Sequence, residues 1–116
     1  MSQTYEHLTF EKSDDVTIVR LRADASELDS LDKTMSEMNQ LIDEGHHKLI
    51  IDLGDVELLQ SAGLGAFVAI DKRLASLDGR IRLVKLRPYV AELFEMTGLD
   101  SVLEIFANEK AALEGL

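Results

Sequence analysis

Apolar positions along this chain follow two periods, one typical of β-strands and the other typical of α-helices. Short alternating or continuous apolar runs predict strands over residues 8–12, 16–22, 48–53 and 81–86, and a short last strand over 102–106. Spacings of three and four residues predict helices between these runs. The first helix would present an apolar face made of Leu28, Leu31, Met35, Met38, Leu41 and Ile42.

Residues that commonly begin or end helices help to predict where the helices lie. The second helix is predicted over residues 62–77. The third would begin at Pro88, where the missing N–H costs nothing. Gly45 and Gly98 stand where a residue in the left-handed region would end the first and third helices, and Asn108 can cap a terminal helix.

The resulting order of elements, ββαβαβαβα, predicts an α/β fold in one domain over residues 1–116. Strands that alternate with helices lie parallel and are joined by right-handed crossovers, whereas the opening hairpin, with its turn at residues 13–15, is antiparallel. We therefore expect a mixed sheet of four to five strands with helices mainly on one face. The apolar layer under the second and third helices would consist of Leu64, Phe67, Val90, Leu93 and Phe94.

The net charge narrows the range of partners. The chain has 22 acidic and 12 basic residues, a formal charge of −10, which argues against binding to nucleic acid or to an anionic membrane surface. No apolar run approaches the ~18 residues needed to span a bilayer, and no signal peptide is visible, so a cytoplasmic location without membrane insertion is expected. The absence of cysteine excludes disulfides and thiolate metal sites.

Acidic residues gather between positions 24 and 44, where Lys33 is the only base. Such a cluster is either a solvated helix face or a docking surface for a basic partner protein, and the pattern alone allows both interpretations. Its members are Asp24, Glu27, Asp29, Asp32, Glu37, Asp43 and Glu44.

Candidate catalytic residues are few. Ser61 follows a predicted strand and precedes a helix, as the nucleophile of a hydrolase elbow does, but Leu59 occupies the place of the first glycine of that motif. None of the three histidines has the spacing of a catalytic triad. We therefore expect no enzymatic activity.

Metal and phosphate sites are equally poorly supported. His46 and His47 could bind a metal ion with Asp52 or Asp55, but adjacent residues point apart and chelate badly. The glycines at 63 and 65 lack the spacing and the lysine of a phosphate-binding loop, and they indicate close packing of helix and sheet instead. We expect neither a metal nor a cofactor.

Ser61 has a second possible role, because it stands at the start of the second predicted helix. Its hydroxyl could cap the exposed N–H groups of that helix, which is a purely structural role. A phosphate on the same oxygen would meet those N–H groups and the positive end of the helix dipole, and would add about −1.5 to −2 charges to the surface.

Two separated segments resemble the STAS family, which includes the anti-sigma factor antagonists. Residues 51–65, IDLGDVELLQSAGLG, resemble the family signature of a strand ending in Asp-Leu, a short loop, and then Asp-Ser-(Ser/Thr)-Gly-Leu-Gly. Residues 86–99, LRPYVAELFEMTGL, resemble the family's Pro…Val…Leu-Phe…(Ser/Thr)-Gly-Leu segment. Gln60 stands where the first motif has Asp, and Ala62 stands where it has a second hydroxyl residue.

The resemblance implies a STAS fold and a protein-binding switch in signal transduction and transcription regulation. It makes Ser61 the residue phosphorylated by a serine kinase of the histidine-kinase-like ATPase type, which doubles as an anti-sigma factor. The unphosphorylated domain would bind this kinase, phosphorylation would release it, and a serine phosphatase would reset the switch. The partner-binding residues would be Asp24, Gln60, Ser61, Ala62, Gly63 and Leu64.

Two other functions fit the same resemblance. The early Gly-x-Leu-Asp element of the family is replaced by residues 23–26, so the regulated process could be secretion or biofilm control. Alternatively, the chain could be a STAS subunit of a lipid-transport ATPase complex that binds its partner constitutively.

Overall fold

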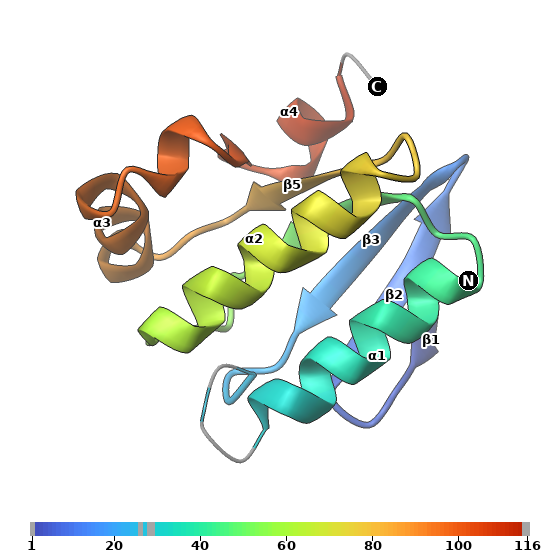
Figure 1. Ribbon diagram of the computed structural model, residues 1–116, viewed down its shortest axis with the longest axis horizontal. Helices are drawn as coiled ribbons and strands as arrows, with labels where there is room; N and C mark the ends of the chain where they lie inside the picture. The colour runs from blue at the N-terminus through green and yellow to red at the C-terminus, as the bar shows by residue number, and fades with distance from the viewer. Residues whose placement is uncertain (1, 26, 28–29, 115–116) are drawn as a thin grey trace.

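The described residues form one sheet that carries helices on both faces (Figure 1). The computed structural model describes residues 2–25, 27 and 30–114. Within this part of the chain the sheet has six strands, β1 (Ser2–Thr4), β2 (Leu8–Ser13), β3 (Val16–Leu21), β4 (Lys48–Asp52), β5 (Arg80–Val84) and β6 (Glu104–Phe106). The helices are α1 (Leu31–Asp43), α2 (Ser61–Ala75), α3 (Pro88–Met96) and α4 (Glu109–Leu113), with a 3-10 turn at Leu99–Ser101.

The strands lie in the sheet in the order in which they follow one another along the chain. The first three are antiparallel because short turns join them, and β3 to β6 are parallel because helical segments cross between them. The predicted mixed sheet and order of elements are confirmed. β1 is an additional edge strand, which the sequence pattern did not predict.

Element ends differ from the predicted ones by a few residues. α2 begins at Ser61, one residue earlier than predicted, and ends at Ala75. α1 begins at Leu31, and the predicted contribution of Leu28 to its apolar face lies outside the described residues, as do Ser26 and Asp29.

The three predicted capping residues are confirmed. Gly45 follows α1 with φ 98°, and the His46 N–H donates to the Leu41 carbonyl at 3.0 Å, which closes the last turn. Gly98 follows α3 with φ 76°. The Asn108 side chain accepts a hydrogen bond from the Ala111 N–H at 2.9 Å and caps α4.

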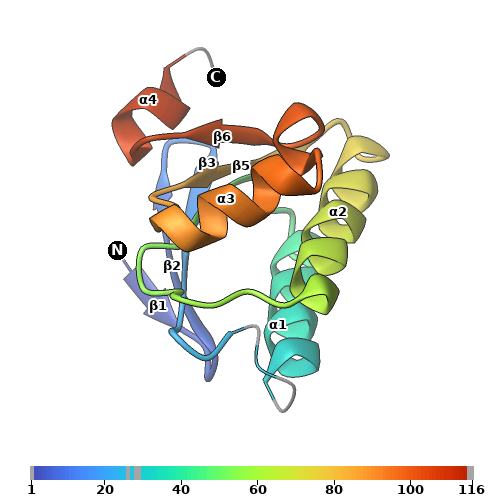
Figure 2. The same ribbon diagram turned by 90° about the vertical axis from the view of Figure 1, so that its left-hand side faces the viewer.

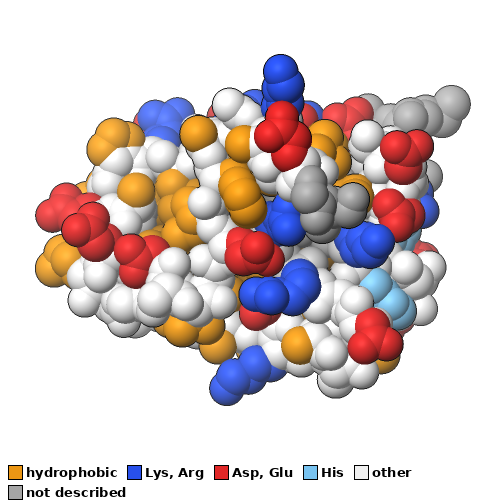
Figure 3. All heavy atoms as spheres, turned by 90° about the horizontal axis from the view of Figure 1, so that it is seen from above, with side chains coloured by type: hydrophobic (Ala, Val, Ile, Leu, Met, Phe, Trp, Pro, Cys, Tyr) orange, Lys and Arg blue, Asp and Glu red, His pale blue; other side chains and the backbone are white. Residues whose placement is uncertain are grey.

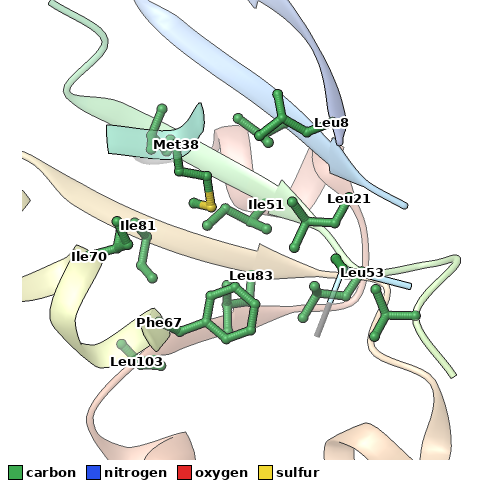
Figure 4. Close-up of a cluster of buried hydrophobic side chains, with 14 of the residues drawn as sticks. Leu8, Leu21, Met38, Ile51, Leu53, Phe67, Ile70, Ile81, Leu83 and Leu103 are labelled. Carbon is green, nitrogen blue, oxygen red and sulfur yellow. The ribbon is translucent and has the colours of Figure 1, made fainter. Parts of the chain in front are cut away.

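The main core lies between the sheet and α1, α2 and α3 (Figure 4). Phe67 of α2 and Phe94 of α3 are buried, with ring centroids 6.4 Å apart. The predicted apolar layer is confirmed for Leu64, Phe67, Val90 and Phe94, while Leu93 is only partly buried and packs against its edge.

A smaller core lies on the other face of the sheet, under α4 (Figure 2). It contains Ala112 of α4 and the strand residues Val16, Ile18, Ile50 and Val84. In the described part of the chain, three helices therefore cover one face and one covers the other, in agreement with the prediction of helices mainly on one face. None of the helices in residues 2–25, 27 and 30–114 has the length and apolarity needed to cross a membrane.

Candidate functional site

Ser61 is the first residue of α2 and is exposed. Gln60 is the N-cap residue, with an extended backbone (φ −93°, ψ 164°) and no capping hydrogen bond from its side chain. The Ser61 hydroxyl makes no hydrogen bond to the described residues. The predicted capping role of Ser61 is therefore wrong, because a cap comes from the last non-helical residue and Ser61 already lies inside the helix.

The first amides of α2 remain available. The Gly63 and Leu64 N–H groups donate to the Gln60 carbonyl at 2.9 and 3.2 Å, whereas those of Ser61 and Ala62 have no acceptor among the described residues. Unpaired amides and the helix dipole favour an anion at this end of a helix. A phosphate on the Ser61 hydroxyl would therefore lie in a favourable electrostatic environment.

The outward face of the first half of α2 consists of small side chains. We call it the small-residue face, made of Ser61, Ala62, Gly65 and Ala69, all of which are exposed. A Cβ atom placed on Gly65 would meet no atom within 4 Å. The predicted role of Gly65 in close packing of helix and sheet is therefore wrong, since this residue faces away from the sheet, and only Gly63 is buried.

The residues that the resemblance assigns to partner binding fall into two groups. Gln60, Ser61 and Ala62 are exposed, whereas Gly63 and Leu64 are buried beneath them. Leu64 is only 6 % exposed and belongs to the main core, so it supports the surface from below.

Asp24 lies on the loop after β3 and is half-buried. The loops that contain Asp24 and Gln60 meet at a hollow of about 230 Å³, which is lined by Ala23, Glu27, Glu57, Leu58 and Gln60. Asp24 does not line the hollow, and its Oδ2 instead accepts a hydrogen bond from Ser30 Oγ at 3.4 Å. Sequence reasoning did not single out Glu57, because its approach to Glu27 depends on how the two loops fold together.

Residues 53–60 connect β4 to Ser61 and run beneath α3 to the start of α2 (Figure 2). Val56 is completely buried and Leu59 is 6 % exposed, and both belong to the main core. Between them, Leu58 is 68 % exposed. The loop is thus fixed to the core at two points while its outer side chains face solvent beside Ser61.

The three histidines have partners of their own. His7 Nδ1 lies 2.7 Å from Glu37 Oε2, and His46 Nδ1 lies 2.7 Å from Thr17 Oγ1. His47 Nε2 lies 3.2 Å from the Ile42 carbonyl oxygen. His46 and His47 therefore turn to different partners, and the described residues contain no group of three carboxylate or imidazole side chains able to hold a metal ion.

Part of the acidic cluster makes contacts within the molecule. Besides the pairing of Glu37 with His7, Asp43 pairs with Arg73, and Glu44 accepts a hydrogen bond from the Tyr5 hydroxyl at 2.8 Å. These contacts attach α1 to its neighbours. They favour the interpretation of the cluster as a helix face with local ion pairs over that of a free docking surface.

Exposed apolar side chains occur mainly at the end of the molecule that carries α3, where Figure 3 shows hydrophobic patches among acidic groups. Tyr89 and Met96 of α3 are 52 % and 74 % exposed, and Val102 after the 3-10 turn is 51 % exposed. This end also carries the start of α2, so apolar area is available close to the Ser61 surface (Figure 1).

The sequence is similar to those of known STAS proteins. The model of the STAS domain family matches residues 7–112. BtrV of Bordetella bronchiseptica, a candidate anti-sigma factor antagonist, is 29% identical over 105 residues, which cover 90% of each chain. The anti-sigma-B factor antagonist of Bacillus subtilis is 33% identical over 66 residues, 57% of this chain and 61% of that protein.

A solved structure agrees as well. The crystal structure of a candidate anti-sigma factor antagonist from Thermotoga maritima superimposes with a TM-score of 0.75, at 28% identity and with 90% of each chain covered. Fold, motif positions and sequence similarity lead to one assignment. The chain belongs to the STAS domain family, among its non-enzymatic anti-sigma factor antagonists.

Proposed function

We propose that this protein is a partner-switching anti-sigma factor antagonist that is controlled by phosphorylation of Ser61. Unphosphorylated, it binds a serine kinase of the histidine-kinase-like ATPase type that also acts as an anti-sigma factor. Phosphorylation of Ser61 releases this partner, and a serine phosphatase restores binding. Because the kinase requires ATP, the switch operates in the cytoplasm.

The observation that carries the proposal is the exposed hydroxyl of Ser61 at the edge of the small-residue face, which makes no hydrogen bond to any residue that the structure describes. A hydroxyl with no hydrogen bond to give up is accessible to a kinase without unfolding of the helix. The face beside it has no long side chain to keep a partner at a distance. This surface fits close contact with another protein better than it fits a pocket for a small molecule.

Phosphorylation at this position would change the surface more than the fold. The phosphate adds about −1.5 to −2 charges and a bulky group, which an interface built on small neutral side chains cannot accommodate. The free amides of Ser61 and Ala62 would stabilise the added charge, so that the helix tolerates it. Gln60 contributes no negative charge of its own beside the phosphate.

The test uses wild-type protein and the Ser61→Ala and Ser61→Glu variants as baits in extracts of the organism that encodes the chain. We expect a histidine-kinase-like ATPase to bind wild type and Ser61→Ala and to be lost with Ser61→Glu. Incubation of wild type with that ATPase and ATP should add one phosphate, which peptide mass spectrometry places on Ser61. Transporter ATPase subunits captured equally by all three baits would overturn the proposal in favour of a constitutive lipid-transport subunit.

A further inference from the structure

Asp52, the last residue of β4, is a carboxylate buried at the point where the loop to Ser61 begins. It is 7 % exposed. Its Oδ1 accepts a hydrogen bond from the Gly54 N–H at 2.8 Å. Its Oδ2 lies 3.4 Å from Lys85 Nζ and 3.7 Å from Arg20 Nε, so two cations, one in β3 and one directly after β5, compensate its charge.

The peptide groups of Gly54 are held from both sides. The Gly54 N–H donates a hydrogen bond to Asp52 Oδ1. The Gly54 carbonyl accepts a hydrogen bond from Arg87 Nε at 2.7 Å. A Cβ atom on Gly54 would lie 3.0 Å from Asp52 Oδ1 and 3.7 Å from the Lys85 side chain. The corner is thus closed around a residue without a side chain, and the first residues of the loop have little freedom.

Lys85 reaches Asp52 from an unusual backbone conformation. Its φ is 58°, in the left-handed region that residues other than glycine seldom adopt. Such a conformation persists only where surrounding contacts enforce it. Lys85 follows the last residue of β5, and its ammonium group pairs with Asp52 from this conformation.

Arg20 connects the same carboxylate to more distant elements. Its guanidinium group also pairs with Glu11 of β2 and with Glu109 in the first turn of α4, both at 2.8 Å. Arg20 lies beside Asp52 because β3 and β4 pair in the register Arg20↔Asp52. Asp52 therefore belongs to a charge network that reaches from β2 to the residue after β5 and includes α4.

We propose that Asp52 is a positioning residue, whose carboxylate holds Gly54 and thereby sets the path by which residues 53–60 present Ser61. Val56 and Leu59, which seat the rest of the loop in the core, follow Gly54 within five residues, so a displaced Gly54 would shift these two contacts and with them the start of α2. The functional part of this inference rests on the proposed switch at Ser61. The structural part does not.

The first measurement is amide hydrogen exchange on the full chain, which needs no partner. Asp52→Ala is compared with Glu104→Ala, which also removes a carboxylate paired with two arginines, Arg80 and Arg82, but does not contact the loop. We expect the Gly54 amide to exchange at least about tenfold faster in Asp52→Ala than in Glu104→Ala when both are corrected for global stability. Equal protection of Gly54 in the two variants would overturn the proposal.

Asp52→Asn covers the case in which Asp52→Ala does not fold. It keeps the shape of the side chain but removes the charge that pairs with Arg20 and Lys85, so these cations no longer hold the side-chain oxygen in place on the Gly54 N–H. Exchange at Gly54 should then be faster than in wild type, while exchange in the β5–β6 pair, where Glu104 lies, should be unchanged. Wild-type protection at Gly54 in this variant would also overturn the proposal.

The second measurement is the rate at which the kinase phosphorylates Ser61 under conditions where every variant is folded. We expect about a tenfold loss or more in Asp52→Ala and little change in Glu104→Ala, since misplacement of a reacting group by about 1 Å can cost up to 10²-fold. An unchanged rate in Asp52→Ala would overturn the positioning role. If wild type itself is not phosphorylated, the proposed function fails, while the exchange of Gly54 still decides whether Asp52 holds the loop.

Discussion

Replacement of Gly65 by alanine is expected to stabilise the protein. Gly65 is the fifth residue of α2, is exposed, and has ordinary helical geometry, so alanine can adopt its backbone conformation without strain. The added methyl group would meet no atom within 4 Å, so it neither clashes nor buries apolar area. What remains is the difference in helix propensity, which favours alanine over glycine by about 0.5–1 kcal/mol.

Urea unfolding followed by circular dichroism measures this gain. With a slope of about 1–3 kcal/mol per molar urea for a small domain, the midpoint should rise by roughly 0.2–1 M at unchanged slope. A midpoint equal to or below that of wild type would show that Gly65 does not lie on an open helix face, and the description of the small-residue face would be wrong.

A longer side chain at the same position separates folding from binding. Gly65→Gln should remain at least as stable as wild type, because glutamine is a better helix former than glycine. It should nevertheless weaken binding of the proposed partner by about tenfold or more, which corresponds to about 1.4 kcal/mol, because it places a long side chain in the middle of the small-residue face. Ala75→Gln, at the exposed far end of α2, is the matched control and should bind like wild type.

Three further predictions follow from single residues. Ser61→Ala should change the free energy of unfolding by less than about 0.5 kcal/mol in urea titrations, because the hydroxyl caps nothing, and a loss above about 1 kcal/mol would restore the capping role. Phe94→Ala should cost about 3–5 kcal/mol in the same assay, because Phe94 is completely buried, and a loss below about 1 kcal/mol would contradict its place in the core. Burial, with a further contribution from the nearby Lys12, lowers the pKa of His46 from its usual 6.5, so the unfolded chain binds the proton more readily. Between pH 7.5 and 5.5 wild type should therefore lose more stability than His46→Gln, and parallel pH profiles would contradict this.

The fold was predictable because its elements carry strong local patterns. The apolar run of β4 and the caps at Gly45 and Asn108 mark the elements without reference to the rest of the chain. β1 has no such pattern. It is a strand because it pairs with β2, in the register Gln3↔Phe10. Pairing of this kind depends on tertiary structure.

The candidate site was predictable in position but not in detail. The motif placed Ser61 at the start of α2, yet serine is common both at the N-cap and in the first turn, and a shift of one residue decides its role. The outward orientation of Gly65 was hidden because glycine contributes nothing to an apolar period. The approach of Arg20 to Asp52 follows from the register of β3 on β4, which no local pattern encodes.

The arrangement of two antiparallel hairpin connections followed by parallel crossovers has a consequence for folding kinetics. β2 and β3 are separated only by residues 14–15, whereas β3 and β4 are separated by residues 22–47 and β4 and β5 by residues 53–79. The entropy lost on closing a loop grows with its length, so the hairpin should form before the crossovers close. Destabilising changes in the β2–β3 hairpin should therefore slow refolding, and those in α3 should mainly speed unfolding.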